Sequence, residues 1–388
     1  MSNTLIIPVF IMNRGCPGRC VYCRVKSLVG PPGTVPDLRT ERSEVVESGL
    51  SPSPDLVEKT VRTYLGYPRK KPELVQLAFY GGSFTSLTRA YQLALLEKAD
   101  DLQRQGLIHS LRISTRPDCL GSEELDLLKA YHVTTVEVGA QSLQDHVLSK
   151  SNRGHTAMDV VSAIGRLKDR GFETGMHLMA GLPGDSREGF IFSVEKTIAL
   201  RPHLVRVHPT LVLAGTPLAE AFCRGEYTPL TRDEAIWAGK EALRRFDAAG
   251  IPVIRLGLQA TEELTRPGNI IAGFYHPSFR ALVEEVIFYD LAASLLAGRD
   301  SNDGGATFIV SPGDVSNFVG QRRGNLLKLA DLFGIAPIEI VTSPDQARGS
   351  VSLMAEKGSA GVPPAVICGR DGHAPMTVQM DSVPYNHV

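Results

Sequence analysis

The sequence predicts an α/β protein, built as a partial, TIM-like (β/α)6 barrel that is followed by a small α/β module. Three observations predict this fold. Six short apolar runs recur along the first part of the chain, single amphipathic helical patterns separate them, and polar or glycine-rich segments follow them. A doubly wound open sheet is the alternative interpretation. In barrels of this kind the functional side chains follow the carboxyl ends of the strands, so those segments hold the candidate residues.

The apolar runs and the helical periodicity give the elements in order. The predicted strands are residues 5–12, 74–80, 110–115, 133–139, 173–180 and 204–209. The predicted helices between them are residues 55–65, 88–105, 122–131, 158–170 and 187–200. Beyond them we expect a helix over 232–249, a strand-like run at 251–256 and a helix over 279–297.

These elements predict four regions: a core barrel over residues 1–260, a helical extension over 261–300, a small α/β module over 301–355 and a loosely ordered tail over 356–388. The module has the order strand, helix, glycine loop, helix and strand, with the loop at residues 320–324. This order is similar to that of the KH module, whose glycine loop clamps a nucleic-acid backbone. A helix-capping turn is the alternative interpretation of the loop.

The composition excludes several classes of protein. The chain has 388 residues, a formal net charge of −1 and 43% hydrophobic residues, which excludes collagenous, mucin-like and disordered proteins. No apolar run approaches the roughly 18 residues of a membrane span. Residues 5–12 lack the basic start and the cleavage site of a signal peptide, and therefore predict a buried strand. We expect a cytoplasmic protein with no membrane partner.

Three of the six cysteines lie within eight residues, directly after the first predicted strand: Cys16, Cys20 and Cys23. Three thiolates on one short loop suit three irons of a [4Fe–4S] cluster and leave the fourth iron open. A zinc ion is the alternative, but it normally needs a fourth protein ligand, and no nearby pair of cysteines supplies one. The other cysteines are scattered, and no metal role is expected for them: Cys119, Cys223 and Cys368.

The Cys-x3-Cys-x2-Cys spacing, with Tyr22 before the last cysteine, resembles the radical SAM enzymes. The resemblance implies a [4Fe–4S] cluster whose open iron chelates S-adenosylmethionine. One electron then cleaves the sulfonium and gives a 5′-deoxyadenosyl radical, while the protein orients the cofactor and excludes water. It also implies an external low-potential electron donor of the flavodoxin or ferredoxin type.

Further motifs extend this resemblance over roughly residues 5–260. Gly81-Gly82-Ser83 follows the second strand where the family has a Gly-Gly motif for the methionine amino group, although a capped strand-to-helix turn also explains it. Gln141 and Arg153 fall where oxygen-independent coproporphyrinogen oxidases and the Elongator catalytic subunit contact the methionine carboxylate and the ribose; exposed polar groups are the alternative. The turn that begins at Gly181 resembles the one that shapes the adenine pocket.

Two positions depart from the family pattern. Ser114 stands where relatives often carry a glutamate, and the aspartate of coproporphyrinogen oxidases is missing near His177. The contacts that those carboxylates make therefore do not carry over unchanged. The residues expected to bind the cofactor are Gly81, Gly82, Ser83, Ser114, Gln141, Arg153, His177 and Gly181.

The function predicted is reductive cleavage of S-adenosylmethionine, acting on an unidentified substrate. The Elongator catalytic subunit, a tRNA wobble-uridine modifying enzyme, is the closest in pattern, so RNA is one expected substrate. No acetyltransferase domain is recognised, so use of acetyl-CoA is not expected. A tetrapyrrole or other small metabolite is the second alternative, and an RNA-binding module with a structural metal cluster is the third.

Two basic stretches bear on these alternatives. They contain no acidic residue and include Arg14, Arg19, Arg24, Lys26 and residues 69–71. Their charge suits a phosphate backbone, or balances that of a cluster and a cofactor carboxylate.

Overall fold

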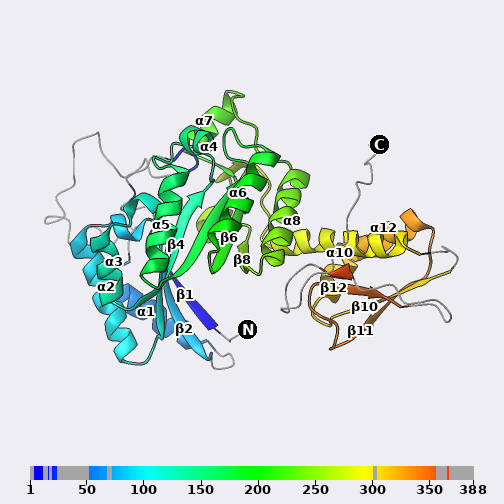
Figure 1. Cartoon of the computed structure of the whole chain (residues 1–388), viewed down its shortest axis with the longest axis horizontal. Helices are drawn as coiled ribbons and strands as arrows, with labels where there is room; N and C mark the ends of the chain where they lie inside the picture. Colours follow the sequence, from blue (N-terminus) through cyan, green and yellow to red (C-terminus); the bar gives the residue numbers. More distant parts are fainter. Residues whose placement is uncertain are drawn as a thin grey trace. The chain divides into compact units, whose positions relative to one another are not determined.

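Seven parallel strands form one curled sheet with helices along its outer face (Figure 1). In spatial order they are β1 Thr4–Phe10, β2 Leu74–Tyr80, β3 Ser110–Thr115, β4 Val133–Gln141, β5 Glu173–Ala180, β6 Leu204–Pro209 and β8 Val253–Leu256. The predicted partial barrel is confirmed. The sheet has one strand more than the six strands predicted for the barrel. The additional strand is β8, which lies within the strand-like run at 251–256 and pairs with β6.

The helices between and after these strands are α1 Pro54–Leu65, α2 Arg89–Arg104, α3 Ser122–Ala130, α4 Asp145–Lys150, α5 Ala157–Asp169, α6 Arg187–Leu200, α7 Pro217–Cys223 and α8 Arg232–Ala248. Several begin at residues whose side chains accept hydrogen bonds from the first turn. Ser53 caps α1, Thr156 and Asp159 form a capping box at α5, and Ser186 caps α6. The sequence did not predict α4 and α7, which are too short to show a helical period.

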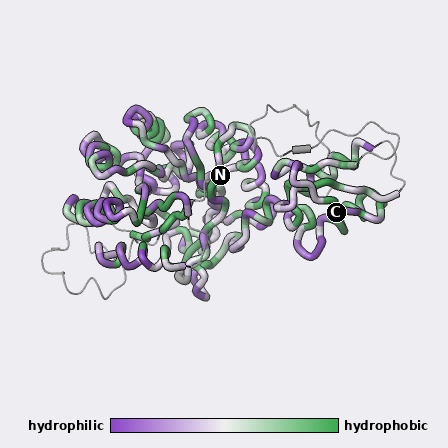
Figure 2. The backbone as a smooth tube through the Cα atoms, turned by 90° about the horizontal axis from the view of Figure 1, so that it is seen from below, coloured by the Kyte–Doolittle hydropathy of each residue, from purple (hydrophilic) through white to green (hydrophobic). Residues whose placement is uncertain are grey.

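The core lies between the sheet and its helices. Apolar residues at alternate strand positions face the helices, as Leu111, Val136 and Val205 do, and each is fully buried. Figure 2 shows hydrophobic and hydrophilic stretches alternating along the helices, as expected for helices with one face on a sheet. The other face of the strands, inside the curl, carries the polar residues described below.

The structure describes residues 4–11, 16, 20–23, 52–67, 72–299, 304–354 and 365–366. These fall into two units, Met1–Ala242 with Pro252–Arg280, and Leu243–Ile251 with Ala281–Val388. The predicted basic stretches, Cys368 and nearly all of the predicted tail lie outside the described residues. The first unit also holds a small antiparallel pair, β7 Val212–Leu213 with β9 Ile270–Ala272, and the short helix α9 Glu262–Thr265. No helix in the described ranges is long and apolar enough to cross a membrane.

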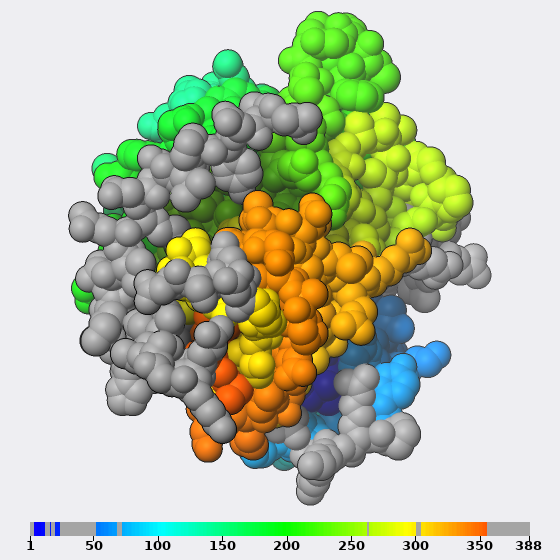
Figure 3. All heavy atoms as spheres, turned by 90° about the vertical axis from the view of Figure 1, so that its right-hand side faces the viewer, coloured from blue at the N-terminus to red at the C-terminus, as the bar shows by residue number. Residues whose placement is uncertain are grey.

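The second unit has its own sheet, in the order β11 Ile338–Thr342, β10 Ala306–Val310, β12 Ser350–Leu353 and β13 Ala365–Val366. Its helices are α10 Phe279–Ala297, α11 Val315–Val319 and α12 Gly324–Phe333. Phe288 of α10 packs with Phe308 of β10 and Phe318 of α11 in one apolar core. In Figure 3 the yellow atoms of α10 lie beside the orange atoms of the later elements.

The expected order of strand, helix, glycine loop, helix and strand is present in this unit. The loop begins at Gly320, whose φ of 75° favours glycine, and continues through a short 3-10 turn, Gln321–Arg323. Strands β10 and β11 run parallel to each other. The likeness to a KH module and the predicted borders at residues 260 and 300 stay predictions.

Candidate active site

A cavity of about 500 Å³ lies at the carboxyl ends of the barrel strands. It brings together ten of the eleven residues that the sequence singled out for a cluster and cofactor: Cys16, Cys20, Cys23, Gly81, Gly82, Ser83, Ser114, Gln141, Arg153 and His177. These residues come from the cysteine loop, from strands β3, β4 and β5 and from the segments that follow β2 and α4. Their convergence matches the rule that function in such barrels lies at this end of the sheet.

Gly181 does not line this cavity. It lines a second cavity of about 600 Å³, together with Lys150, Tyr227 and Leu230. The Tyr227 hydroxyl donates a hydrogen bond to the Gly181 carbonyl oxygen, 2.6 Å away. A Cβ atom at Gly181 would stand 2.5 Å from Leu230, so the residue is a point of close packing.

The three clustered cysteines all reach the first cavity. Cys20 is buried, whereas Cys16 and Cys23 are partly exposed. In the described part of the chain, no three His, Cys, Asp or Glu side chains lie close enough together to bind one metal ion. An iron–sulfur cluster makes a different demand, because each thiolate binds its own iron and the thiols need not converge on one point. Three thiols that line one cavity therefore fit a cluster.

Two buried arginines stand next to these thiols. Arg153 Nη1 donates to Cys20 Sγ at 3.2 Å, and Arg153 Nη2 donates to the Gly139 carbonyl oxygen at 2.5 Å. Arg116 Nη1 lies 4.0 Å from Cys16 Sγ, and its Nη2 donates to the Arg153 carbonyl oxygen. Asp118 accepts two hydrogen bonds from Arg116 and fixes its orientation. The two guanidinium groups thus offset negative charge beside the cysteine loop.

The end of β4 is irregular at Gln141. Its φ is 69°, in the left-handed region that few residues other than glycine adopt, and the pairing of β4 with β5 shifts register before it. Such bulges redirect a side chain next to a site. Gly139 makes room for the result, since a Cβ atom there would lie 3.0 Å from Gln141 Nε2 and 3.4 Å from Arg153 Nη2.

Glycine and hydroxyl groups also line the cavity. Gly81 adopts a φ of 86°, which turns the chain sharply after β2. Ser83 Oγ lies 2.9 Å from Thr115 Oγ1 and accepts a hydrogen bond from the Arg116 backbone nitrogen. Ser114 Oγ is buried without a hydrogen-bond partner in the described residues, as is Arg153 Nε. Buried polar atoms normally have partners, so both atoms are available to a ligand.

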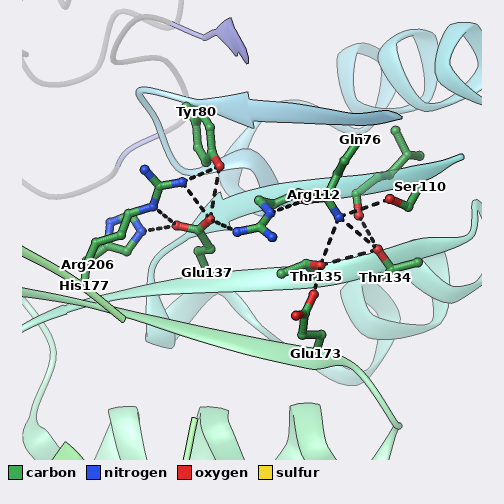
Figure 4. A network of polar contacts seen from close by, with 11 residues as sticks. Gln76, Tyr80, Ser110, Arg112, Thr134, Thr135, Glu137, Glu173, His177 and Arg206 are labelled. Atoms are coloured by element: carbon green, nitrogen blue, oxygen red, sulfur yellow. Dashed lines mark hydrogen bonds and ion pairs between the residues drawn. The ribbon is translucent and has the colours of Figure 1, made fainter. Parts of the chain in front are cut away.

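A buried carboxylate, Glu137 of β4, lies inside the curled sheet (Figure 4). It accepts hydrogen bonds from Arg112 Nη1 at 2.7 Å, from Arg206 Nε at 2.6 Å and from the Tyr80 hydroxyl at 3.1 Å, and it also pairs with His177. Burial alone raises the pKa of a carboxyl group. The His177 hydrogen bond and the two guanidinium charges outweigh that effect and hold the pKa of Glu137 well below its usual range.

Comparison with known families decides the assignment. The model of the radical SAM superfamily matches residues 10–196, and that of the radical SAM C-terminal domain matches residues 202–287, together more than half of the chain. The chain belongs to the radical SAM superfamily. It is an enzyme of that class, and the predicted Elongator-like branch is confirmed by the relatives described next.

Two curated relatives illustrate the similarity. The tRNA uridine(34) acetyltransferase of Methanocaldococcus jannaschii is 30% identical over 264 residues, which cover 61% of this chain and 48% of that protein. Elongator complex protein 3 of Schizosaccharomyces pombe is 32% identical over 177 residues, which cover 40% of this chain and 32% of that protein. The radical SAM chain thus spans half or less of the length of these relatives.

A solved structure confirms the fold. Elp3 of the archaeon Methanocaldococcus infernus superposes with a TM-score of 0.56 and 22% identity, covering 74% of this chain and 63% of the other. Membership of the radical SAM superfamily implies S-adenosylmethionine and a [4Fe–4S] cluster. The three thiols and the unpartnered buried polar atoms of the cavity fit that pair of cofactors.

The sequence prediction missed the charged residues inside the radical SAM barrel. Arg112, Glu137 and Arg206 each stand between two apolar residues of a strand. That alternation was a usable signal. Helices cover the outer face of a barrel, so a charged residue between buried apolar neighbours points into the interior.

His208 of β6 also lines the cavity. Burial, together with the charges of His177 and Arg206, lowers the pKa of His208 to about 3, and its Nδ1 donates to the Gly257 carbonyl oxygen. The folded protein therefore favours neutral His208, so its contribution to stability is present above about pH 6.5 and is lost as the pH falls toward 3.

We expect the H208Q variant to lose part of this acid sensitivity. Urea unfolding between pH 4 and 7 should show a slope that is smaller by up to about 1.4 kcal/mol per pH unit than in the unmodified chain. Equal slopes in the two proteins would contradict the neutral state assigned to His208.

Proposed function

We propose that this radical SAM enzyme binds a [4Fe–4S] cluster through Cys16, Cys20 and Cys23, cleaves S-adenosylmethionine reductively and acts on a nucleoside in RNA, with tRNA as the first candidate. One observation carries the cofactor part. The three thiols line the same cavity as seven of the eight residues expected to contact S-adenosylmethionine, although these come from distant parts of the sequence.

Different residues of the chain are proposed to bind and to orient the cluster and S-adenosylmethionine. When bound, the cluster supplies the single electron that cleaves the sulfonium of S-adenosylmethionine. Arg153 donates to Cys20 Sγ. Among the described residues its Nε and Ser114 Oγ have no partner, so both would contact the cofactor when it is bound. Gly81 lets the backbone approach a ligand closely. The electron is proposed to come from a flavodoxin-type or ferredoxin-type donor.

The relatives support RNA as the substrate class. The names of the two relatives reported above concern tRNA uridine and the Elongator complex. Three clustered thiols suit a reducing compartment, so a cytoplasmic location is part of the proposal.

Anaerobic reconstitution tests the cofactor part. The purified full-length chain should bind about four irons and release 5′-deoxyadenosine only when dithionite is present. A protein that binds a single zinc ion and releases no 5′-deoxyadenosine would overturn the proposal and favour a structural metal.

Profiling of modified nucleosides in tRNA, from cells with and without the protein, tests the RNA part. Loss of one modified nucleoside on deletion, restored by the active chain, is the expected result. An unchanged tRNA profile with an altered tetrapyrrole or other small metabolite would assign the alternative substrate.

Substitution of Arg153 should slow the release of 5′-deoxyadenosine without abolishing it. The R153M variant removes the donors to Cys20 Sγ and to Gly139 while keeping most of the side-chain volume. Hydrogen bonds to sulfur tune a cluster potential, and loss of an outer contact typically costs 10- to 100-fold in activity. We expect a 10- to 100-fold slower release of 5′-deoxyadenosine and a lower midpoint potential, whereas R166M, outside the cavity, should change neither.

A further inference from the structure

Arg206 and Arg255 stand side by side in the barrel. Strands β6 and β8 pair in parallel, and the register places Arg206 directly opposite Arg255. Neighbouring strands lie about 4.8 Å apart, so two residues in register share one face of the sheet. Both side chains line the cavity of the site. Two guanidinium groups are thereby held next to each other on the side of the cavity that β6 and β8 form.

Among the described residues, the carboxylates near the cavity are fewer than the cations that they could neutralise. Glu137 is shared by Arg112, Arg206 and His177, so one negative charge serves two guanidinium groups and an imidazole. Arg206 commits its Nε and Nη2 to Glu137 and Tyr80, which leaves Nη1 without a partner in the described residues. Arg255 makes no hydrogen bond or ion pair with the described part of the chain, and no Asp or Glu is among the described residues that line the cavity.

This arrangement costs folding free energy. Burial, and then the charge of Arg206, lower the pKa of Arg255, which is the effect of desolvation combined with like-charge repulsion. A guanidinium group held beside a second one, with no carboxylate of its own among the described residues, is unusual in a fold selected for stability alone, and such groups concentrate at functional sites. A bound anion would supply the missing negative charge.

We propose that Arg206 and Arg255 bind a phosphate group of the substrate, a phosphorylated nucleoside. The inference rests on the proposed function, because it assigns a substrate group to the same cavity. Guanidinium groups present forked donors that match phosphate oxygens. The residues expected to contact S-adenosylmethionine come mainly from β2 to β4 and the segments that follow them, whereas the proposed phosphate subsite lies on β6 and β8.

His208 indicates the nucleoside part. Because its Nδ1 donates to the Gly257 carbonyl oxygen, Nε2 of the neutral ring is an acceptor. An acceptor next to two cations suits a ribose hydroxyl better than a second phosphate oxygen.

Calorimetric titration of the reconstituted chain with uridine 5′-monophosphate tests the subsite. The R255Q variant should bind this nucleotide about tenfold more weakly, a loss equivalent to about 1.4 kcal/mol, and R255K should recover part of the affinity. Arg255 shares no carboxylate, so R255Q should fold, with an unfolding temperature equal to or above that of the unmodified chain. R244Q, which alters an exposed arginine outside the cavity, is the matched control and should bind normally.

The outcomes separate the possibilities. Uridine binding as tightly as its monophosphate, unchanged binding by R255Q, or equally tight binding of acetate would each overturn the phosphate subsite. Competition by S-adenosylmethionine would also overturn it, because the anion would then occupy the cofactor site. Displacement by a short oligouridylate supports the subsite with RNA as the source of the phosphate, and tight binding without such displacement supports it with a free nucleotide. Release of 5′-deoxyadenosine is measured separately, so failure of the proposed function is distinguishable from failure of the subsite.

Discussion

The E137Q variant should unfold with a free energy about 3–5 kcal/mol lower than that of the unmodified chain. Glu137 is fully buried, and it is the shared acceptor of Arg112, Arg206, Tyr80 and His177. Glutamine keeps the shape but removes the charge, so the buried guanidinium group of Arg112 and the partly buried one of Arg206 lose their counter-ion. The cost is that of leaving these charges uncompensated, rather than that of one hydrogen bond.

Urea unfolding at pH 7, followed by a signal from the barrel, measures this effect. E226Q is the matched control, because Glu226 pairs with Arg224 at 2.7 Å, the same separation as Glu137 to Arg112, but more than half of each side chain is exposed. An exposed pair contributes about 0–1 kcal/mol. Equal effects of the two substitutions would contradict the role assigned to Glu137.

Acid adds an independent check on the same residue. The pKa of Glu137 is held below its usual range, so its stabilising effect is present above about pH 4.3 and is lost as the pH falls below that value. The E137Q variant should lack this component of acid unfolding. A variant with the same acid profile as the unmodified chain would show that Glu137 is not ionised in the fold.

The barrel was predictable because local patterns agree with the tertiary fold. Turn residues bound the apolar runs, such as the run that forms β5. Thr156 and Ser186 are typical N-cap residues, and α5 and α6 begin directly after them. Two strands of the second unit, β12 and β13, were not predicted. Strands β12 and β13 are short, and β13 has two residues, so no alternation distinguishes them from a loop.

Part of the candidate site was likewise predictable from the sequence, and part was not. Residues with a contiguous motif, such as the cysteines and Gly81-Gly82, were found in the sequence, and the structure brings them to one cavity. Arg206 and Glu137 were missed. Their hydrogen bond joins residues 69 positions apart, so no local motif marks the two as partners. Only the curled sheet makes them neighbours. Relatives often carry a glutamate where this chain has Ser114. Here a buried carboxylate, Glu137, lies opposite Ser114 on the neighbouring strand β4.

The C20A variant should lose dithionite-dependent release of 5′-deoxyadenosine by more than about 100-fold, beyond the loss typical of a residue outside the ligand set. Cys20 is the most buried of the three clustered thiols and accepts the hydrogen bond of Arg153, so its removal takes away a proposed iron ligand and the anchor of that arginine. Iron content and the 5′-deoxyadenosine assay measure both consequences. C223A is the matched control, since Cys223 is exposed on α7 and outside the cavity, and it should retain full activity. Activity in C20A equal to that in C223A would contradict the proposal that the cysteine loop binds the cluster. Loss of activity in C20A alone would favour a catalytic cluster over a structural metal, because only a catalytic cluster makes cleavage of S-adenosylmethionine depend on this thiol.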